Sequence, residues 1–199
     1  MRWILFLMLI SVIACKQPAE KPVIPKAQPI VIPNDTIKAA AETMLQVDNG
    51  YLKFKFKLFS GYVLMNYENG GLKSIISYYQ GKQEGWAYEY FENGKPLSKR
   101  YYHLGEKDSV HIGWWDNGNT RFVYHFKNGV YNGSFEEYYN SGKPLKKISY
   151  YNGNDSFGTG WRENGKIFMN YIMKDGRRYG VMNAQPCYSL KNERGEYVK

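Results

Sequence analysis

Two stretches of the chain, Asn93-Gly94-Lys95-Pro96-Leu97 and Ser141-Gly142-Lys143-Pro144-Leu145, are nearly identical and lie 48 residues apart. An Asn-Gly or Ser-Gly dipeptide recurs around them at intervals of 24, 24, 24 and 23 residues. A second series of glycines follows the first by 11 residues each time. Two series locked at one offset indicate an internal repeat with a unit of about 24 residues. The first series is Gly70, Gly94, Gly118, Gly142 and Gly165, and the second is Gly81, Gly105, Gly129, Gly153 and Gly176.

Each unit has the features of a β-hairpin. Asn-Gly is a strong hairpin signal because both central residues of a type I′ turn adopt positive φ, so we expect such a turn at each Asn-Gly. Each unit then contains two strands and two turns. A single hairpin is marginally stable, so about five units, from Gly61 to Gly180, should form one extended antiparallel meander. The predicted fold class is all-β.

The composition agrees with this prediction. The 199 residues include 19 Tyr, 10 Phe, 5 Trp and 20 Gly, which favours strands joined by tight turns and excludes a largely disordered chain. Two columns of the repeat are expected on one half-buried face of the sheet, because they alternate along the same strand. The columns are Tyr78, Tyr102, Phe126, Tyr150 and Met173, and Ile76, Arg100, Tyr124, Ile148 and Tyr171.

A third column is the candidate binding face. Tyr90, Trp114, Tyr138 and Trp161 occupy one register of successive units and should form a row across the sheet. An exposed row would stack on sugars or hold an extended partner, whereas a covered row would belong to the core. The sequence leaves both alternatives open.

The amino-terminal segment differs from the repeat. Residues 1–14 carry one charge, Arg2, and an apolar run that is shorter than the roughly 20 residues of a membrane-spanning helix, which is typical of a secretory signal. Its end, Val12-Ile13-Ala14-Cys15, resembles the lipobox of bacterial lipoproteins. That resemblance implies cleavage before Cys15 and attachment of lipid to its sulfur. Two or three acyl chains would anchor the protein stably on a membrane.

Residues 15–47 are expected to form a disordered tether. Prolines recur every three or four residues, which suits an extended chain and excludes a helix interior. From Asp35 to Leu45 the sequence allows either a short helix, with Asp35 or Thr36 as N-cap, or a continuation of the tether. The expected organisation is a signal peptide at 1–14, the tether at 15–47, the repeat domain at 48–180 and a cap or tail at 181–199.

The repeat resembles the MORN repeat family, in the bacterial variant known as YwqK-type antitoxin repeats. The stretches that carry the resemblance are residues 61–74, 78–85 and 90–95. It implies a hairpin-repeat architecture and, by the family's name, an antitoxin or immunity-type binder. Two departures predict a less regular sheet: Ser109 stands where Gly85 and Gly133 stand in other units, and the fifth unit is one residue short.

The sequence offers no catalytic or cofactor motif. It has no Ser-His-Asp or Cys-His arrangement and no phosphate-binding loop, and Glu136 and Glu137 are strand neighbours whose side chains point to opposite faces. The three histidines share no metal-ligand spacing. We therefore expect no metal, no cofactor and no enzymatic activity.

The carboxyl-terminal stretch breaks the period. It either caps the last edge strand or forms a partner site with Arg177, Arg178 and Cys187, the one thiol left once Cys15 is lipidated. The formal charge is +9, but Lys and Arg are scattered, so nucleic acid is not an expected partner. The sequence favours a non-catalytic scaffold of the bacterial cell envelope, held on the membrane through Cys15 and contacting an unknown protein or glycan. The alternatives are a toxin-neutralising binder and a carbohydrate or cell-wall binding module.

Overall fold

The computed structural model describes residues 29–38 and 45–183. The chain divides into two units, residues 1–30 and 31–199, and both β-sheets lie within the second. The signal segment, Cys15, most of the tether and Cys187 lie outside the described residues.

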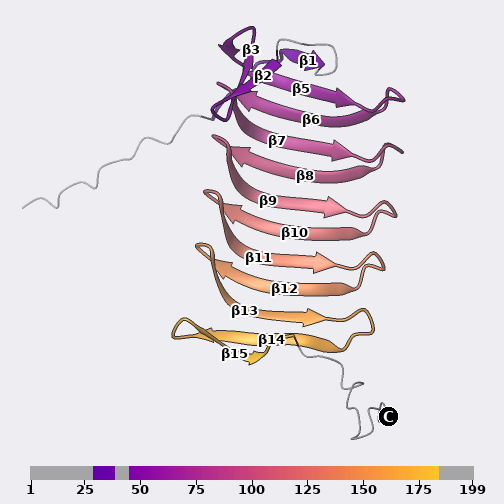
Figure 1. The fold of residues 1–199 in the computed structure, drawn as a ribbon, viewed down its shortest axis with the longest axis vertical. Helices are drawn as coiled ribbons and strands as arrows, with labels where there is room; N and C mark the ends of the chain where they lie inside the picture. The colour runs from indigo at the N-terminus through magenta and orange to yellow at the C-terminus, as the bar shows by residue number, and fades with distance from the viewer. Residues whose placement is uncertain (1–28, 39–44, 184–199) are drawn as a thin grey trace, which may run out of the picture. The chain divides into compact units, whose positions relative to one another are not determined.

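The large sheet confirms the predicted meander. Eleven of its twelve strands follow one another in chain order from β5 to β15, each antiparallel to the next, and the twelfth, β1, is added at the first edge (Figure 1). Its strands are β1 (Thr36–Lys38), β5 (Gly61–Asn66), β6 (Leu72–Tyr79), β7 (Lys82–Tyr90), β8 (Pro96–His103), β9 (Glu106–Trp114), β10 (Thr120–Lys127), β11 (Val130–Tyr138), β12 (Pro144–Tyr151), β13 (Asn154–Trp161), β14 (Ile167–Lys174) and β15 (Arg177–Val181).

The first glycine series forms the loops on the right-hand edge of Figure 1, but these are not the type I′ turns that we expected. At Asn69-Gly70 only Gly70 has positive φ (+85°), and Gly70 N donates to Tyr67 O at 3.0 Å. This is a three-residue loop in which a tight turn is followed by a left-handed glycine. Asn69 contributes differently, because its Oδ1 accepts a hydrogen bond from Gly71 N at 2.8 Å.

The second series forms the type I′ turns, on the opposite edge of the sheet. Both central residues have positive φ, as at Asn128 (+49°) and Gly129 (+81°). Four of the five glycines also tie their turn to the preceding unit: Gly129 N donates to Lys107 O at 2.8 Å, and Gly81, Gly105 and Gly153 make the same bond. The constant 11-residue offset therefore reflects one loop and one tight turn at opposite ends of each strand pair.

The two departures from the repeat do not disturb the sheet. In β7, β9 and β11 a bulge adds two residues relative to the preceding strand, with positive φ at Gly85, Ser109 and Gly133. Ser109 adopts this conformation (+58°) without a glycine. In β13 the bulge holds one extra residue instead of two. The short unit thus loses its residue from the bulge: the expected irregularity is confined to this shorter bulge, and strand order and pairing continue through both departures.

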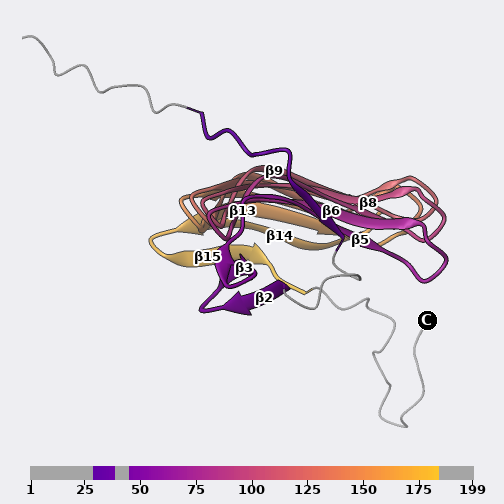
Figure 2. The ribbon, with the colours of Figure 1, turned by 90° about the horizontal axis from the view of Figure 1, so that it is seen from above.

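The amino-terminal end has its own small sheet, formed by β2 (Leu45–Asp48), β3 (Tyr51–Phe54) and β4 (Lys57–Leu58). It lies on one side of the large sheet, as the view along the stack of strands shows (Figure 2). A buried cluster joins the two: Ile37, Leu52, Phe59 and Val63, with Leu45, Phe54 and Tyr78 against it.

The segment before the small sheet corrects one expectation. Thr36–Lys38 form strand β1, which pairs in parallel with β5, and not the first turn of a short helix. Residues 39–44, the rest of the stretch considered for that helix, lie outside the described residues.

The two faces of the large sheet are distinguished by register, because residues paired across antiparallel strands share a face. One face, here the strip face, carries Val63, Tyr78, Tyr102, Phe126 and Tyr150, and the small sheet packs on it. The other, the opposite face, carries Trp86, Lys99, Ile112 and Phe157. The two predicted columns lie on the strip face, as expected.

Candidate functional site

The predicted aromatic row lies at the ends of four strands. Tyr90, Trp114, Tyr138 and Trp161 are the last residues of β7, β9, β11 and β13, and all four are half-buried. One strand separates each ring from the next, so successive rings are about 9.5 Å apart. The residues that pair with them and lie between the rings are Pro96, Thr120, Pro144 and Ile167. The row is partly open to solvent, between the two alternatives that the sequence allowed.

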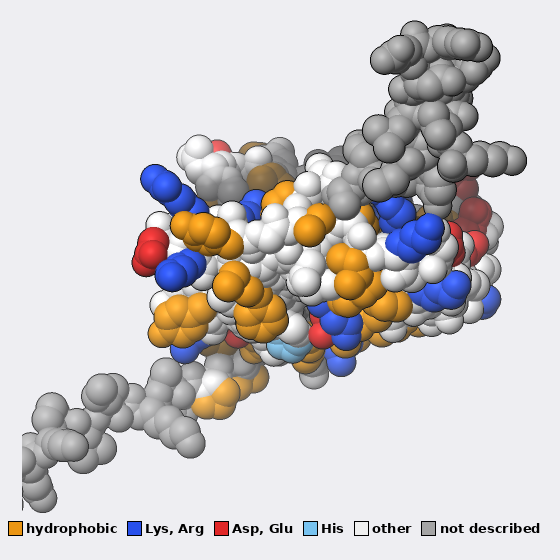
Figure 3. Space-filling view, turned by 90° about the horizontal axis from the view of Figure 1, so that it is seen from below, with side chains coloured by type: hydrophobic (Ala, Val, Ile, Leu, Met, Phe, Trp, Pro, Cys, Tyr) orange, Lys and Arg blue, Asp and Glu red, His pale blue; other side chains and the backbone are white. Residues whose placement is uncertain are grey.

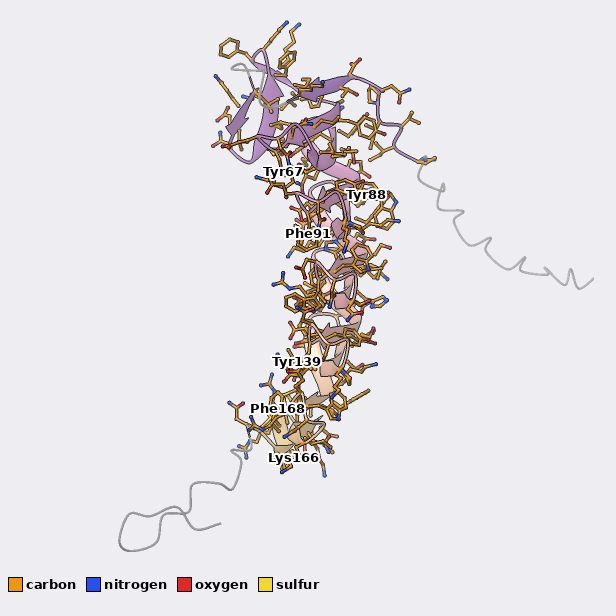
Figure 4. All side chains as sticks on the ribbon, turned by 90° about the vertical axis from the view of Figure 1, so that its right-hand side faces the viewer. Tyr67, Tyr88, Phe91, Tyr139, Lys166 and Phe168 are labelled. Carbon is orange, nitrogen blue, oxygen red and sulfur yellow. The ribbon has the colours of Figure 1, made fainter. Side chains whose placement is uncertain are left out.

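The residues that follow the row connect the units. The Tyr67 hydroxyl donates to Tyr90 O at 2.7 Å, and Tyr139 and Trp115 donate in the same way to the following unit. Tyr67, Phe91 and Tyr139 follow one another along the loop edge, and Tyr88 lies on the other side of the sheet (Figure 4). Phe91 occupies the corresponding position of its unit, but its side chain has no hydrogen-bond donor. Sequence reasoning found these aromatics and missed their bonds, although a donor recurring every 24 residues was a usable signal.

The strip face carries a continuous set of ring contacts across β8 to β12, which we call the aromatic strip. His111 lies in the middle of it, with its ring centroid 5.3 Å from that of Tyr102 and 4.6 Å from that of Phe126. Phe126 stacks on Tyr131 at 4.6 Å, and Tyr131 lies 5.0 Å from Tyr150. The repeat columns predicted Tyr102, Phe126 and Tyr150. His111 and Tyr131 were missed because they belong to the alternate strands.

A hollow of about 280 Å³ opens beside the aromatic strip, between β8 and β11. A second stack of rings bounds it, since Tyr124 lies 4.6 Å from Phe122 and 4.3 Å from Phe135 at interplanar angles of 13° and 17°. Two cations, Arg100 and Lys107, contribute to its wall. The full lining is Arg100, Tyr102, Lys107, His111, Phe122, Tyr124, Phe126 and Tyr131.

Electrostatics in the hollow favour negative ligands. Burial lowers the pKa of His111, and the charges of Arg100 and Lys107 lower it further, against a hydrogen bond to Tyr101 that raises it. A carbonyl oxygen only accepts, so His111 Nε2 donates to Tyr101 O (2.8 Å) and Nδ1 is left as an acceptor. Arg100 Nη1 pairs with Glu89 Oε2 at 3.0 Å.

A phenol beside the hollow is held in its neutral form. Burial raises the pKa of Tyr124, and the hydrogen bond that its hydroxyl donates to Glu137 Oε1 at 2.8 Å raises it further. The hydroxyl therefore stays protonated across the physiological pH range and continues to donate its hydrogen bond to Glu137.

The opposite face has a smaller aromatic cluster on β7 and β8. Lys99 Nζ lies 4.0 Å from the ring centroid of Trp86 and 5.7 Å from that of Tyr88, and Tyr101 packs edge-on against Trp86 at 5.1 Å. The ammonium of Lys99 already lies over the face of the indole ring, so that ring face is used by a contact within the protein.

The carboxyl-terminal candidates are not brought together. Arg177 and Arg178 are neighbours in β15, so their side chains point to opposite faces. Arg178 lies on the strip face, where its Nε is 3.0 Å from Asp155 Oδ2 and its guanidinium lies over the Tyr171 ring at 5.0 Å. Cys187 lies outside the described residues.

An apolar patch on the opposite face covers the last three strands, and Figure 3 shows this end of the sheet from below. Phe157 pairs with Ile172, and Ile172 with Tyr179, so the three side chains form one line across β13, β14 and β15. Val181 follows on the same face. Their exposures are 56% for Phe157, 58% for Ile172, 49% for Tyr179 and 47% for Val181. We call these four residues the terminal patch.

Two kinds of feature are absent from the described part of the chain. Residues 29–38 and 45–183 contain no group of three or more His, Cys, Asp or Glu placed to hold a metal ion. No helix that could span a membrane occurs in the same ranges.

Comparison with known proteins gave no relative, because no protein-family model and no curated protein matched the chain. The resemblance to MORN repeats stays a prediction.

Proposed function

We propose that this chain is a non-catalytic, lipid-anchored protein of the bacterial cell envelope whose sheet is a scaffold for contact with another protein. The contact is placed at the carboxyl-terminal end of the sheet. The partner contributes an extended segment that adds a strand to β15 and packs alternate apolar side chains on the terminal patch.

The observation that carries this proposal is the unfinished edge at β15. β15 has five residues and pairs only with residues 170–174 of β14, so residues 167–169 have no strand beside them on that side within the described chain. Unpaired backbone groups on an edge strand are a template for another strand. Exposed apolar side chains that line up beside such an edge are typical of protein contact sites.

The anchor rests on the segment around Cys15. Lipid on this cysteine and the proline-spaced residues after it would hold the sheet near a membrane surface while leaving its last strand accessible. Cys15→Ala should abolish incorporation of radiolabelled palmitate. Continued labelling of that variant would refute the anchor and leave the contact site untouched.

The contact site is tested by photo-crosslinking in membranes of the source cell. A photoreactive phenylalanine at Tyr179 should crosslink one discrete protein, and the Ile172→Thr variant should lose that product. Phe56, which is 81% exposed at the other end of the described structure, is the matched control position and should give no such product. An equal product from both positions, or none from Tyr179, would contradict the proposal.

A further inference from the structure

The hollow on the strip face has features that the packing of the sheet does not require. Lys107 is exposed, and its Nζ lies 5.2 Å from the ring centroid of Phe126, beside the opening. Arg100 donates one N–H to Glu89 and has four further N–H donors. Two cations therefore border a cavity whose walls are otherwise aromatic.

Uncharged polar groups converge on the same cavity. The hydroxyls of Tyr102 and Tyr131 form no hydrogen bond with another described residue, and neither does Nδ1 of His111, which is 3% exposed. The residues that line the hollow thus carry two such hydroxyls, one acceptor nitrogen and two cations. This mixture matches a ligand with several hydroxyl groups and one negative charge.

The orientation of the rings favours the same ligand class. Phe126 and Tyr131 stack on each other at 28°, and Tyr124 stacks between Phe122 and Phe135, so ring faces are used by neighbouring rings. Ring edges, which carry the positive part of the aromatic quadrupole, are left for a ligand, and they attract oxygen atoms.

Charges around the hollow argue against a dense polyanion. The strip face also carries Glu89, Glu137 and Asp155, each near a phenol or a cation of the same face. Closely spaced phosphates of a nucleic acid would meet these carboxylates along the aromatic strip. A mostly neutral glycan with a single acidic sugar carries one negative charge, which can lie where Arg100 and Lys107 are while its neutral sugars pass the carboxylates.

We infer that this hollow binds one acidic sugar residue, such as a hexuronic acid, of an extracellular or envelope glycan. The carboxylate pairs with Arg100 and Lys107, and the sugar hydroxyls bond to Tyr102, Tyr131 and Nδ1 of His111. The site is separate from the protein contact proposed at β15 and does not depend on it.

The test uses the full chain in detergent micelles. A short neutral oligosaccharide that carries one galacturonate residue, its methyl ester, acetate and oligothymidylate are each titrated by calorimetry, and the ring signals of His111 and Phe126 are followed by NMR. The acid oligomer should bind and shift both signals. The ester, which keeps the sugar hydroxyls but replaces the carboxylate by a neutral methyl ester, should bind at least about tenfold more weakly, because hydrogen bonds to charged groups are the strong ones.

Variants distinguish the hollow from the general positive charge of the chain. Lys107→Gln should weaken binding of the acid oligomer by about tenfold. Lys99→Gln, next to Arg100 on the same strand but on the opposite face, should leave it unchanged. The inference is overturned if the acid oligomer does not bind, if the ester or acetate binds equally well, if oligothymidylate binds more tightly, or if both variants have the same effect.

Discussion

The repeat array starts and stops halfway along a repeat strand, and its two ends finish differently. At the first end, Gly61 precedes Gly70 by nine residues, as Gly85 precedes Gly94, so β5 is the second half of a repeat strand. The residues that would form its first half are 58–60; of these only Leu58 belongs to a strand, β4 of the small sheet, and Phe59 O still accepts a bond from Gly81 N. At the last end, β15 follows Gly176 as β7 follows Gly81, and it is the first half of such a strand.

The first end is closed by chain from outside the repeat. The three-residue strand β1 covers β5, and the cluster around Phe59 and Leu52 buries apolar side chains beneath the small sheet. A very short edge strand is a poor template for pairing. The last end has no comparable cover among the described residues, since every residue of β15 is exposed. Closure of the first end therefore comes from specific flanking sequence, and we propose that the last end is the one that meets a partner.

The largest expected effect separates the two ends by stability. Phe59 is 7% exposed and packs against Phe54 and Tyr78, so Phe59→Ala should reduce the free energy of unfolding by about 3–5 kcal/mol. Phe157→Ala in the terminal patch should cost below about 1 kcal/mol, because that ring is already half in water. Denaturant unfolding measures both. Equal losses would mean that the ends are equally packed.

A second prediction concerns pH at the open end. Burial raises the pKa of Asp155, but the hydrogen bond from Tyr171 and the ion pair with Arg178 outweigh it and hold the pKa below its usual value. A lowered pKa stabilises the fold above the unfolded value of about 3.9, and this contribution is lost as the pH falls through the lower folded value.

Asp155→Asn should therefore reduce stability at pH 7 by about 1–2 kcal/mol, discounted because Arg178 is half exposed. The difference from the unaltered chain should shrink as the pH falls below about 4. Unfolding curves recorded from pH 7 to pH 3 measure it, and a constant difference over that range would contradict the assignment.

A third prediction tests whether the interior of the array is uniform between its ends. Tyr67→Phe and Tyr139→Phe each remove one hydrogen bond between units and should each cost about 0.5–1.5 kcal/mol. Phe91→Tyr should gain a similar bond to the next unit. Strand-resolved hydrogen exchange is the suitable measurement, because repeat arrays can unfold from one end. Unequal costs for Tyr67 and Tyr139 would show that the units themselves differ.

The smallest effect is expected for Ile172→Thr. Isoleucine and threonine are both β-branched, and Ile172 is 58% exposed. The free energy of unfolding should therefore change by no more than about 0.5 kcal/mol. Binding of a hydrophobic dye to the chain should nevertheless fall. A large loss of stability would place Ile172 in a core and remove the terminal patch.

The repeat itself could be predicted from the sequence, because glycine spacing reports turns directly. The type of each turn could be predicted only in part. The Asn-Gly pairs suggested type I′ turns, yet Asn69 prefers to accept a bond from Gly71 N, while less typical pairs such as Leu104-Gly105 take the type I′ form. At this loop the hydrogen bond of the asparagine side chain outweighs the preference of Asn-Gly for a type I′ turn.

The candidate site was predictable only for residues that recur. Tyr102, Phe126 and Arg100 lie in the predicted columns, whereas His111 lies in no column and reaches them only through the pairing of the strands. The parallel pairing of β1 with β5 had no periodic signal either. The composition of the site and the pairing of β1 both depend on which strands become neighbours. The sequence of a single repeat unit does not contain this information.

The open carboxyl-terminal end is tested most directly by hydrogen exchange of residues 177–183. In the purified chain these amides should exchange fast, while those of β5 and β6 exchange slowly. In intact membranes that contain the partner, protection should rise at 177–183 and stay unchanged at β5 and β6. Slow exchange at 177–183 in the purified chain, or no change in membranes, would contradict the account.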